Sequence, residues 1–304
     1  MNETIETKKK TTLNRIQHFV DRGGPREWEY PELTENIDRL AGLIKDQTLP
    51  AAEIDAMLSA CGFVQNQRSV MGHIRLKPYG YAGDFDIIDR IYRQETCDPE
   101  YSYWDRFALQ HSAAAAVRNR KRYFVEMITA RMGQGHRLEL CNIASGPGRD
   151  LYEAYELLTD KSALKTTCVE MEPKAIGYAS KLNEAYAEHI HFVQRNVFRF
   201  QSEKQYDLVW SAGLFDYFDD KLFVLLLNRF GQWLKPGGEI VIGNFNEAHN
   251  PSRDFMEIFG DWHLNHRSEE QLISLALEAG YSREQLYVGR EPEQVNLFLH
   301  IRMS

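Results

Sequence analysis

The second half of the chain alternates short apolar runs with amphipathic segments, and this alternation restricts the fold more than any other feature. Five apolar runs follow Leu138: "RLELCNIA", "LKTTCVEM", "HIHFVQRNV", "YDLVWSAG" and "GEIVIGNF". Segments with helical periodicity lie between or after them, at about 150–158, 173–187, 219–233 and 268–279. Strands that alternate with helices form a parallel sheet covered on both faces. We therefore expect an α/β domain over residues 133–304.

The end of the chain breaks this alternation. The stretch "EQLYVGREPEQVNLFLHIRM" holds two extended runs around Glu291-Pro292 without a helical segment between them, which predicts an antiparallel hairpin at a sheet edge. Residues 11–132, by contrast, have helical patterns throughout, broken by the loop "DRGGPREWEYP". We expect residues 1–132 to form a helical cap or substrate region, with the boundary near "RMGQGHR" at 131–137.

Charge and cysteine content exclude several classes of protein. The 304-residue chain has a net charge of −8, and its nearest approach to a basic cluster is "RNRKR" at 118–122. Nucleic acid is therefore not expected as a partner, because phosphate binding relies on clustered Lys and Arg. The four cysteines are scattered without a C-x-x-C pair, so we expect reduced thiols and no metal site.

No apolar run approaches the roughly 20 residues of a membrane helix, and "MNETIETKKKTT" does not resemble a signal peptide. We expect a cytoplasmic protein without stable membrane insertion. The sequence leaves the oligomeric state open.

The loop "CNIASGPGRD" after the first strand has the form of a ligand loop. Gly146 and Gly148 let the backbone approach a ligand, and the helix that follows offers free N–H groups. A dinucleotide fingerprint would need glycine at Leu151, and a P-loop would need Lys and Ser or Thr at Arg149 and Asp150. Alone, the loop fits either a nucleotide-like ligand or an ordinary strand–helix turn.

The ends of the next two strands favour the ligand. Glu170 ends the second strand, where an acidic side chain can accept hydrogen bonds from both hydroxyls of a ribose. Asn196 ends the third strand, where its amide can read an adenine edge, and Val197 offers a backbone N–H.

In this order, the elements from Leu138 to Met303 resemble the class I S-adenosylmethionine-dependent methyltransferases. The resemblance implies a Rossmann-like, mostly parallel seven-stranded sheet with an antiparallel C-terminal hairpin, preceded here by an all-helical cap. It implies S-adenosylmethionine as cofactor, with the loop glycines along its methionine and ribose parts, Met171 on the adenine and Glu170 on the ribose. The cofactor-binding candidates are Tyr81, Arg120, Ala144, Gly146, Gly148, Glu170, Met171, Asn196, Val197 and Ser211.

Three positions depart from the family pattern. Asn142 stands where an acid is common, Ala144 where glycine is common, and Asn196 where aspartate is commoner. Alanine is the smallest replacement, so we expect the loop to close. Asn142 and Ala144 are also the only support for a non-catalytic, cofactor-binding regulatory protein.

A narrower resemblance spans both halves of the chain. "KPYGYAGDFDIIDRIY", "AVRNRKRYF", "SAGLFDYF" and "NPSRDFMEIFGDWHLNHRS" are similar to bacterial synthases of the 3-hydroxypalmitate methyl ester signal. This resemblance implies carboxyl O-methylation of an apolar fatty or hydroxy acid. The alternative is an N- or O-methyltransferase of a specialised metabolite.

The helical half offers further candidates for the site. In "KPYGYAGDFD", we expect Asp84 to cap a helix and Tyr79 or Tyr81 to face a ligand, unless the segment is only a helix connector. Arg120 shares an apolar helical stripe and therefore needs an anion, either the cofactor's carboxylate or an internal acid such as Asp84 or Asp86. Several aromatic residues suit an apolar acceptor or a plain core: Phe85, Tyr92, Tyr103, Trp104 and Phe107.

The acceptor decides which residues act in catalysis. A carboxylate, with a reference pKa of about 4, is a nucleophile at neutral pH and needs only orienting groups. The candidates for that role are His249, Tyr217 and Arg253, and Asn244 is a further one.

An amine or hydroxyl acceptor more often needs a base, for which His249, His263 and Asp216 are the candidates. His263 and His266 are three residues apart and would share a face if that segment were helical, although we do not expect a metal there.

Overall fold

The computed structural model describes residues 4–133 and 137–303, and the chain forms two compact units. The first unit comprises the chain up to Ala115 together with Pro251–His263, and the second comprises Ala116–Asn250 together with the chain from Leu264. This division differs from the expected boundary between residues 132 and 133. Part of the expected boundary stretch, 134–136, lies outside the described residues.

The difference has a physical reason in two helices. From its sequence pattern, helix α8 (Ser112–Met132) is expected to belong to the helical half. Its residues Phe124, Val125 and Ile128 are instead buried in the core of the α/β unit. Helix α12 (Arg253–Gly260), which follows the fifth strand in sequence, packs against helices of the first unit. Periodicity identifies a helix but does not say which core will bury it.

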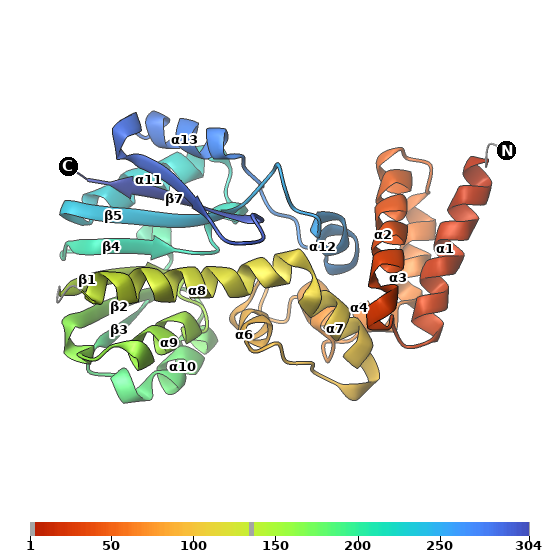
Figure 1. Cartoon of the computed structure of the whole chain (residues 1–304), viewed down its shortest axis with the longest axis horizontal. Coiled ribbons are helices and arrows are strands. Elements are labelled where there is room, and N and C mark those ends of the chain that lie inside the picture. The colour runs from red at the N-terminus through yellow and green to blue at the C-terminus, as the bar shows by residue number, and fades with distance from the viewer. Residues whose placement is uncertain (1–3, 134–136, 304) are drawn as a thin grey trace. The chain divides into compact units, whose positions relative to one another are not determined.

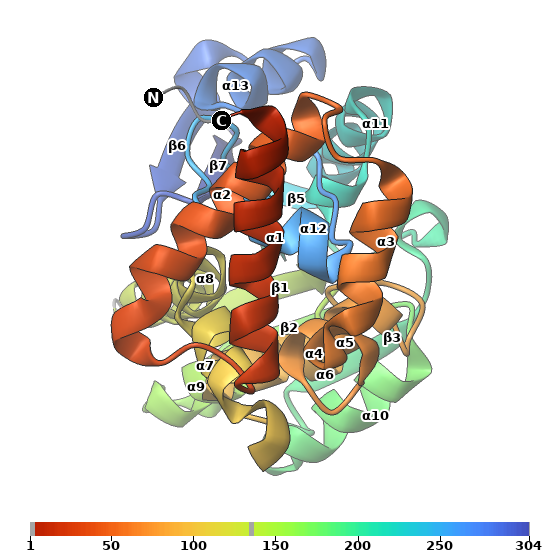
Figure 2. The same cartoon turned by 90° about the vertical axis from the view of Figure 1, so that its right-hand side faces the viewer.

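Figure 2 shows the first three helices of the first unit lying side by side. Besides α12, the helices of this unit are α1 (Ile5–Asp21), α2 (Tyr30–Lys45), α3 (Ala51–Ala60), α4 (Gly62–Gln65), α5 (Val70–Leu76), α6 (Phe85–Arg93) and α7 (Ser102–Gln110). Asp84 caps α6 as expected, since its carboxylate accepts the N–H groups of Asp86 and Ile87.

The aromatic residues considered for an acceptor pocket mostly form the core of this unit. Trp104 is stacked on Phe63 with ring centroids 3.8 Å apart, and Phe107 packs edge-on against Phe255. Phe85, Tyr92, Trp104 and Phe107 are all buried, while the guanidinium groups of Arg26 and Arg106 lie 3.4 and 4.6 Å from the centroid of the Tyr103 ring. For these residues the simpler interpretation, a packed core, is the one that the structure supports.

The second unit contains one seven-stranded sheet with the order β3-β2-β1-β4-β5-β7-β6. The strands are β1 (Leu138–Ile143), β2 (Leu164–Glu170), β3 (Ile190–Gln194), β4 (Tyr206–Ser211), β5 (Leu234–Phe245), β6 (Leu286–Arg290) and β7 (Asn296–Arg302). The first five run parallel, whereas β7 is antiparallel to both β5 and β6. The predicted fold class and terminal hairpin are confirmed.

Helices cover both faces of this sheet (Figure 1). One buried cluster joins the sheet to α8 and α9, and the other joins it to α11 and α13. The bounds of the remaining helices are α9 (Arg149–Leu157), α10 (Pro173–Leu182), α11 (Asp220–Gln232) and α13 (Glu269–Glu278). The carboxyl ends of the five parallel strands meet at one edge, which is where such sheets bind ligands.

Among the described helices, none is long and apolar enough to cross a membrane.

Candidate functional site

The loop between β1 and α9 has the backbone of a tight ligand loop. Ala144, Gly146 and Gly148 all have left-handed φ values, of 52°, 55° and 65°. A Cβ at Gly148 would lie 3.2 Å from the Cβ of Ala179, so this glycine permits close packing against α10. A Cβ at Gly146 would meet nothing within 4 Å, so that side of the loop is open. Ala144 adopts the conformation that glycine would adopt more cheaply.

Glu170 ties the end of β2 to this loop. Its Oε2 accepts the Gly146 N–H at 3.0 Å, and its Oε1 accepts the N–H groups of Met171 at 2.7 Å and Glu172 at 3.0 Å. The side chain is only 8% exposed. Because a carboxylate offers about four acceptor positions, Oε2 retains room for one further donor from a ligand.

Met171 and Asn196, predicted to meet an adenine, lie together at the ends of β2 and β3. The Asn196 Nδ2 lies 3.4 Å from the Met171 Sδ, and its Oδ1 accepts the Phe198 N–H at 2.9 Å. Met171 is 58% exposed, whereas Val197 is buried. An exposed thioether beside an open loop offers an apolar surface to a flat ring.

Arg120 lies beside the turn that follows β4. Its Nη1 is 3.5 Å from the Ala212 carbonyl oxygen, and a Cβ at Gly213 would lie 2.8 Å from the same nitrogen. Burial raises the pKa of Asp150 to about 6 and that of Asp216 to about 7, while the charge of Arg120 lowers both. Arg120 therefore acts on two buried carboxylates of its own unit.

The acids that the sequence offered as internal partners of Arg120 are engaged within the first unit. Asp84 lies 2.8 Å from the His73 Nε2, and Asp86 accepts from Arg90 at 2.7 Å. Asp150 and Asp216, which the sequence did not single out as partners of Arg120, are the acids on which its charge acts.

Two buried polar side chains near the carboxyl ends of their strands have a polar atom without a hydrogen bond in the described residues. The Nδ2 of Asn142, in β1, and the Oγ of Ser211, in β4, make no hydrogen bond within the described part of the chain. The two residues are 2% and 0% exposed. A buried donor without a partner costs about 1–3 kcal/mol, so a ligand that accepts from it recovers that energy.

Residues 135–285 match the family model described as "Methyltransferase domain". This segment is a methyltransferase domain. No curated protein has detectable similarity to the chain. The match confirms the predicted enzyme class and covers every cofactor-binding candidate except Tyr81 and Arg120.

Solved structures share the fold of this domain. A structure described as a possible exported protein from Bordetella parapertussis is 16% identical, covers 99% of this chain and 97% of its own, and has a TM-score of 0.64. The magnesium protoporphyrin IX methyltransferase of Synechocystis PCC 6803, solved with bound S-adenosylhomocysteine, is 13% identical. That alignment covers 78% of this chain and 100% of the other, with a TM-score of 0.55. At these identities the likeness concerns the fold alone.

Arg267 fixes the segment of the methyltransferase domain that follows β4, a role that no sequence pattern indicates. The side chain is 4% exposed and donates to the carbonyl oxygens of Phe215 at 3.2 Å and Phe218 at 2.6 Å. It also donates to the Asn244 Oδ1 at 3.0 Å and the Asp220 Oδ1 at 2.9 Å. One guanidinium thereby joins the β4–α11 segment to β5.

Asn244, which the sequence offers as a group that could orient the acceptor, is engaged in hydrogen bonds within its own unit. It is fully buried, and its Nδ2 donates to the carbonyl oxygens of Phe245 and Asn265, both at 3.0 Å. The amide is used to hold the end of β5.

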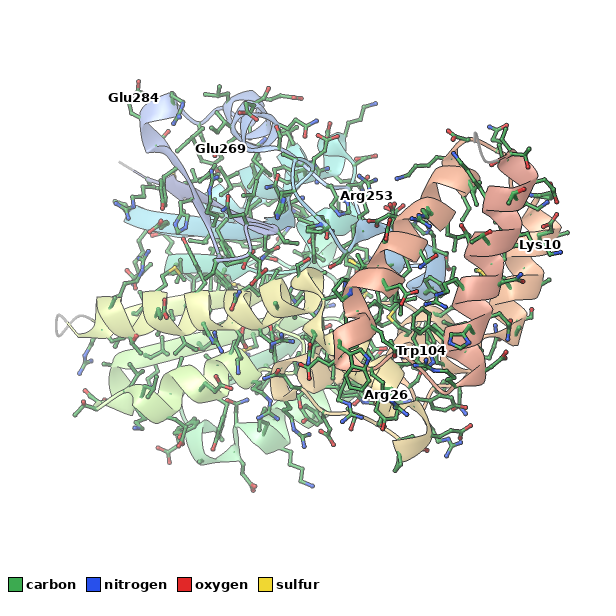
Figure 3. The ribbon with its side chains drawn as sticks, turned by 45° about the vertical axis from the view of Figure 1, so that its right-hand side comes forward. Lys10, Arg26, Trp104, Arg253, Glu269 and Glu284 are labelled. Atoms are coloured by element: carbon green, nitrogen blue, oxygen red, sulfur yellow. The ribbon has the colours of Figure 1, made fainter. Side chains whose placement is uncertain are left out.

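The other acceptor-side candidates do not all belong to the methyltransferase domain. Tyr217, 38% exposed, and His249, also exposed, are in the second unit. Arg253 (Figure 3), whose Nε donates to Glu257 at 2.7 Å, is in the first unit. Tyr81 belongs to the same unit.

The two histidines do not share a helical face. The helix before them ends at Gly260, and His263 and His266 are assigned to different units. Across residues 4–133 and 137–303, no group of three His, Cys, Asp or Glu side chains is arranged to hold a metal ion.

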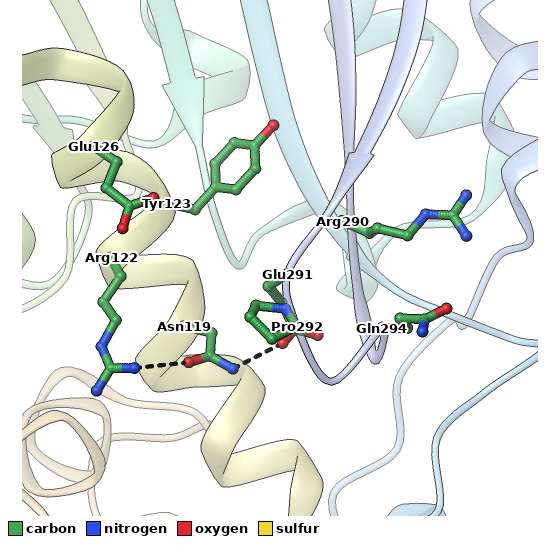
Figure 4. Close-up of a pocket in the computed structure, with 8 residues that line it drawn as sticks. All are labelled: Asn119, Arg122, Tyr123, Glu126, Arg290, Glu291, Pro292 and Gln294. Atoms are coloured by element: carbon green, nitrogen blue, oxygen red, sulfur yellow. Dashed lines mark hydrogen bonds between the residues drawn. The ribbon is translucent and has the colours of Figure 1, made fainter. Parts of the chain in front are cut away.

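A separate cavity of about 650 Å³ lies between α8 and the β6–β7 turn (Figure 4). The Asn119 side chain joins the two walls, since its Nδ2 donates to Glu291 at 3.0 Å, and its Oδ1 accepts from Arg122 of the same helix at 3.4 Å. Glu291 is buried and also accepts backbone N–H groups of its own turn. None of the cofactor-binding candidates lines this cavity.

Proposed function

We propose that this enzyme methylates a small-molecule acceptor, with S-adenosylmethionine as donor and the carboxylate of an apolar fatty or hydroxy acid as the preferred acceptor. The observation that carries the choice of donor is the link between Glu170 and Gly146, which places a buried carboxylate under an open glycine loop. Bound S-adenosylmethionine would supply a methyl group activated by a positively charged sulfur.

Residues of the second unit bind the cofactor in this proposal. Glu170 accepts from a ribose hydroxyl through its remaining lone pair, and Met171 offers its exposed thioether to the adenine ring. The Asn142 Nδ2 and the Ser211 Oγ donate hydrogen bonds to the cofactor. Both atoms are buried and have no other hydrogen-bond partner in the described residues.

A carboxylate acceptor suits the groups that follow β4 and β5. It needs no base, only groups that orient it for in-line attack and exclude water. Asp216, the acid that could serve as a base, is 1% exposed and accepts the Phe245 N–H at 2.6 Å. Tyr217 and His249 remain as exposed groups of this unit that can orient an acceptor, and Arg253 is proposed for the same role.

N- or O-methylation of a specialised metabolite is the second candidate. It is favoured by one observation, the pKa of about 7 that burial gives Asp216, which is the range of a general base. A purely regulatory role loses its main support, because Ala144 adopts the left-handed conformation of the loop despite its side chain. A cytoplasmic location is part of the proposal and is supported by four free cysteines.

Transfer of a radiolabelled methyl group to a cell extract, followed by identification of the labelled product, tests this function. We expect the label in a small apolar molecule from which mild base releases it, because methyl esters hydrolyse and methylamines do not. Label that resists base would favour the second candidate. Cofactor binding without transfer to any component of the extract would contradict both.

A further inference from the structure

Asn296, the first residue of β7, carries a buried side-chain amide without a hydrogen bond on either side. The residue is 1% exposed, and neither its Nδ2 nor its Oδ1 has a partner within residues 4–133 and 137–303. Of the side-chain amides in this part of the chain, it is the only one in which both atoms are buried and unpartnered. Buried polar groups in folded proteins are almost always hydrogen-bonded, so the partner of this amide comes from a ligand or from water.

The backbone around Asn296 is fixed by contacts of other side chains. Its N–H donates to the Glu291 Oε1 at 3.0 Å, and Asn119 of α8 donates to the Glu291 Oε2 at the same distance (Figure 4). Asn246, after β5, donates through its Nδ2 to the Gln294 carbonyl oxygen at 2.9 Å. These bonds tie the β6–β7 turn to α8 and to the end of β5. The Asn296 amide takes no part in them, so its role is not to hold the turn.

Asn296 lies near the chain segments that carry the proposed acceptor-orienting groups. It is paired in register with Phe245, the last residue of β5. The Phe245 N–H donates to the Asp216 Oδ1 at 2.6 Å, and Tyr217 follows Asp216 directly. His249 follows Phe245 by four residues. All five residues belong to the second unit, so the amide and these segments meet within one compact part of the chain.

The amide points to the face of the sheet that α8 covers. Phe298, two residues further along β7, stacks on Tyr123 of α8 with ring centroids 4.0 Å apart. Alternate residues of a strand point to the same face, so Asn296 points there as well. Arg120 lies on the same helix, three residues before Tyr123, and its Nη1 is 3.5 Å from the Ala212 carbonyl oxygen, just after β4. A carboxylate bound at this edge therefore has a guanidinium on the same face as the amide.

A primary amide recognises a pair of groups rather than a single one. Its nitrogen donates, its oxygen accepts, and the two atoms lie side by side. An ionised carboxylate only accepts, so a plain fatty acid would engage the Nδ2 and leave the buried Oδ1 without a donor. A hydroxyl near the carboxylate supplies that donor. A hydroxy acid therefore satisfies the whole amide, and such a site discriminates against the acid that lacks the hydroxyl.

We infer that Asn296 determines the specificity of this enzyme for a hydroxy acid, with its Oδ1 accepting from the hydroxyl and its Nδ2 donating to one carboxylate oxygen. The inference rests on the proposed function and narrows its acceptor to acids that carry a hydroxyl near the carboxylate. The second carboxylate oxygen forms the new bond to the methyl carbon, while the bond from that carbon to sulfur breaks and its electron pair goes to sulfur. The products are a methyl ester and S-adenosylhomocysteine, and no proton is transferred.

Two acids that differ by one hydroxyl test the inference. Methyl transfer from S-adenosylmethionine to 3-hydroxypalmitate and to palmitate is measured as kcat/KM with the full chain, in wild type and in Asn296→Leu. Leucine has the same branching and the same number of heavy atoms as asparagine but no polar side-chain atom. Asn228→Leu is the matched control, because Asn228 is an exposed asparagine of α11 in the same unit.

We expect wild type to prefer 3-hydroxypalmitate by about tenfold or more. Asn296→Leu should reduce this preference to less than about threefold, mainly through slower methylation of the hydroxy acid, while the control keeps the wild-type preference. The affinity for S-adenosylhomocysteine in calorimetric titration should be the same in all three proteins. Because leucine leaves no buried polar atom unpartnered, Asn296→Leu should also unfold at a higher denaturant concentration than wild type, which shows that the variant is folded.

Four results would overturn the inference. Equal use of both acids by wild type would leave the proposed function in place but show that the site does not recognise the hydroxyl. An unchanged preference in Asn296→Leu, or an equal loss of activity with both acids, would show that Asn296 does not bind the hydroxyl. If wild type methylates neither acid, the proposed acceptor class itself fails, and the inference fails with it.

Discussion

The carboxylate of Glu170 accepts the backbone N–H of Gly146 at 3.0 Å, joining two residues that are 24 positions apart in the chain. This contact links the second strand to the loop after the first. Glu170 Oε2 keeps acceptor capacity for one further donor, because a carboxylate oxygen can accept two hydrogen bonds. The proposed cofactor site depends on this pair more than on any other contact.

Ala144→Gly should stabilise the protein. Ala144 has a φ of 52°, a conformation that costs an alanine about 1–2 kcal/mol more than a glycine, partly offset by the greater chain entropy of glycine when unfolded. We expect the free energy of unfolding to rise by about 0.5–1 kcal/mol in calorimetric melting. Ala130→Gly, at an exposed position of α8, is the control and should lower it. A lower free energy of unfolding in Ala144→Gly would contradict the claim that the backbone at Ala144 is strained.

Arg267→Lys should destabilise the methyltransferase domain by about 2–4 kcal/mol, because lysine cannot satisfy the carbonyl groups of Phe215 and Phe218 and the Asn244 side chain together. Denaturant unfolding measures the loss. Arg290→Lys is the control, since Arg290 is half exposed and pairs with Glu269 at the surface. If both substitutions lower the free energy of unfolding equally, the hydrogen bonds of Arg267 do not stabilise the β4–α11 segment.

Asp216 should make stability fall as the pH rises. Burial raises its pKa from the usual 3.8 to about 7, so the folded state holds a proton more tightly than the unfolded chain between these values. Stability is therefore lost progressively as the pH rises from about 4 to about 7. Asp150, with a pKa raised to about 6, adds to the same trend.

Asp216→Asn removes this titration and keeps an oxygen to accept the Phe245 N–H. We expect the stability of the variant relative to wild type to improve by roughly 2–4 kcal/mol between pH 4.5 and pH 8. Denaturant unfolding at the two pH values gives the difference. A constant difference would mean that Asp216 titrates alike in the folded and unfolded states.

The order of the elements in the second unit could be predicted because each strand and helix carries its own periodic pattern. The position of Glu170 at the end of its strand and the terminal hairpin both follow from local sequence. The helix N-cap at Asp84 is local in the same way.

What could not be predicted depends on contacts distant in sequence. Arg267 reaches segments around 215–220, and nothing near it in sequence indicates those partners. The burial of Asn244 and the charges that act on Arg120 likewise arise only when strands and helices come together. The assignment of α12 to the first unit has the same cause, because an amphipathic helix does not specify its partner.

Calorimetric titration of the protein with S-adenosylhomocysteine, in wild type and in Glu170→Ala, tests the central claim most directly. We predict one binding site in wild type and at least a tenfold loss of affinity in Glu170→Ala, with wild-type affinity in the control Glu184→Ala, an exposed acid after α10. Unchanged affinity in Glu170→Ala, or no binding to wild type, would contradict the account.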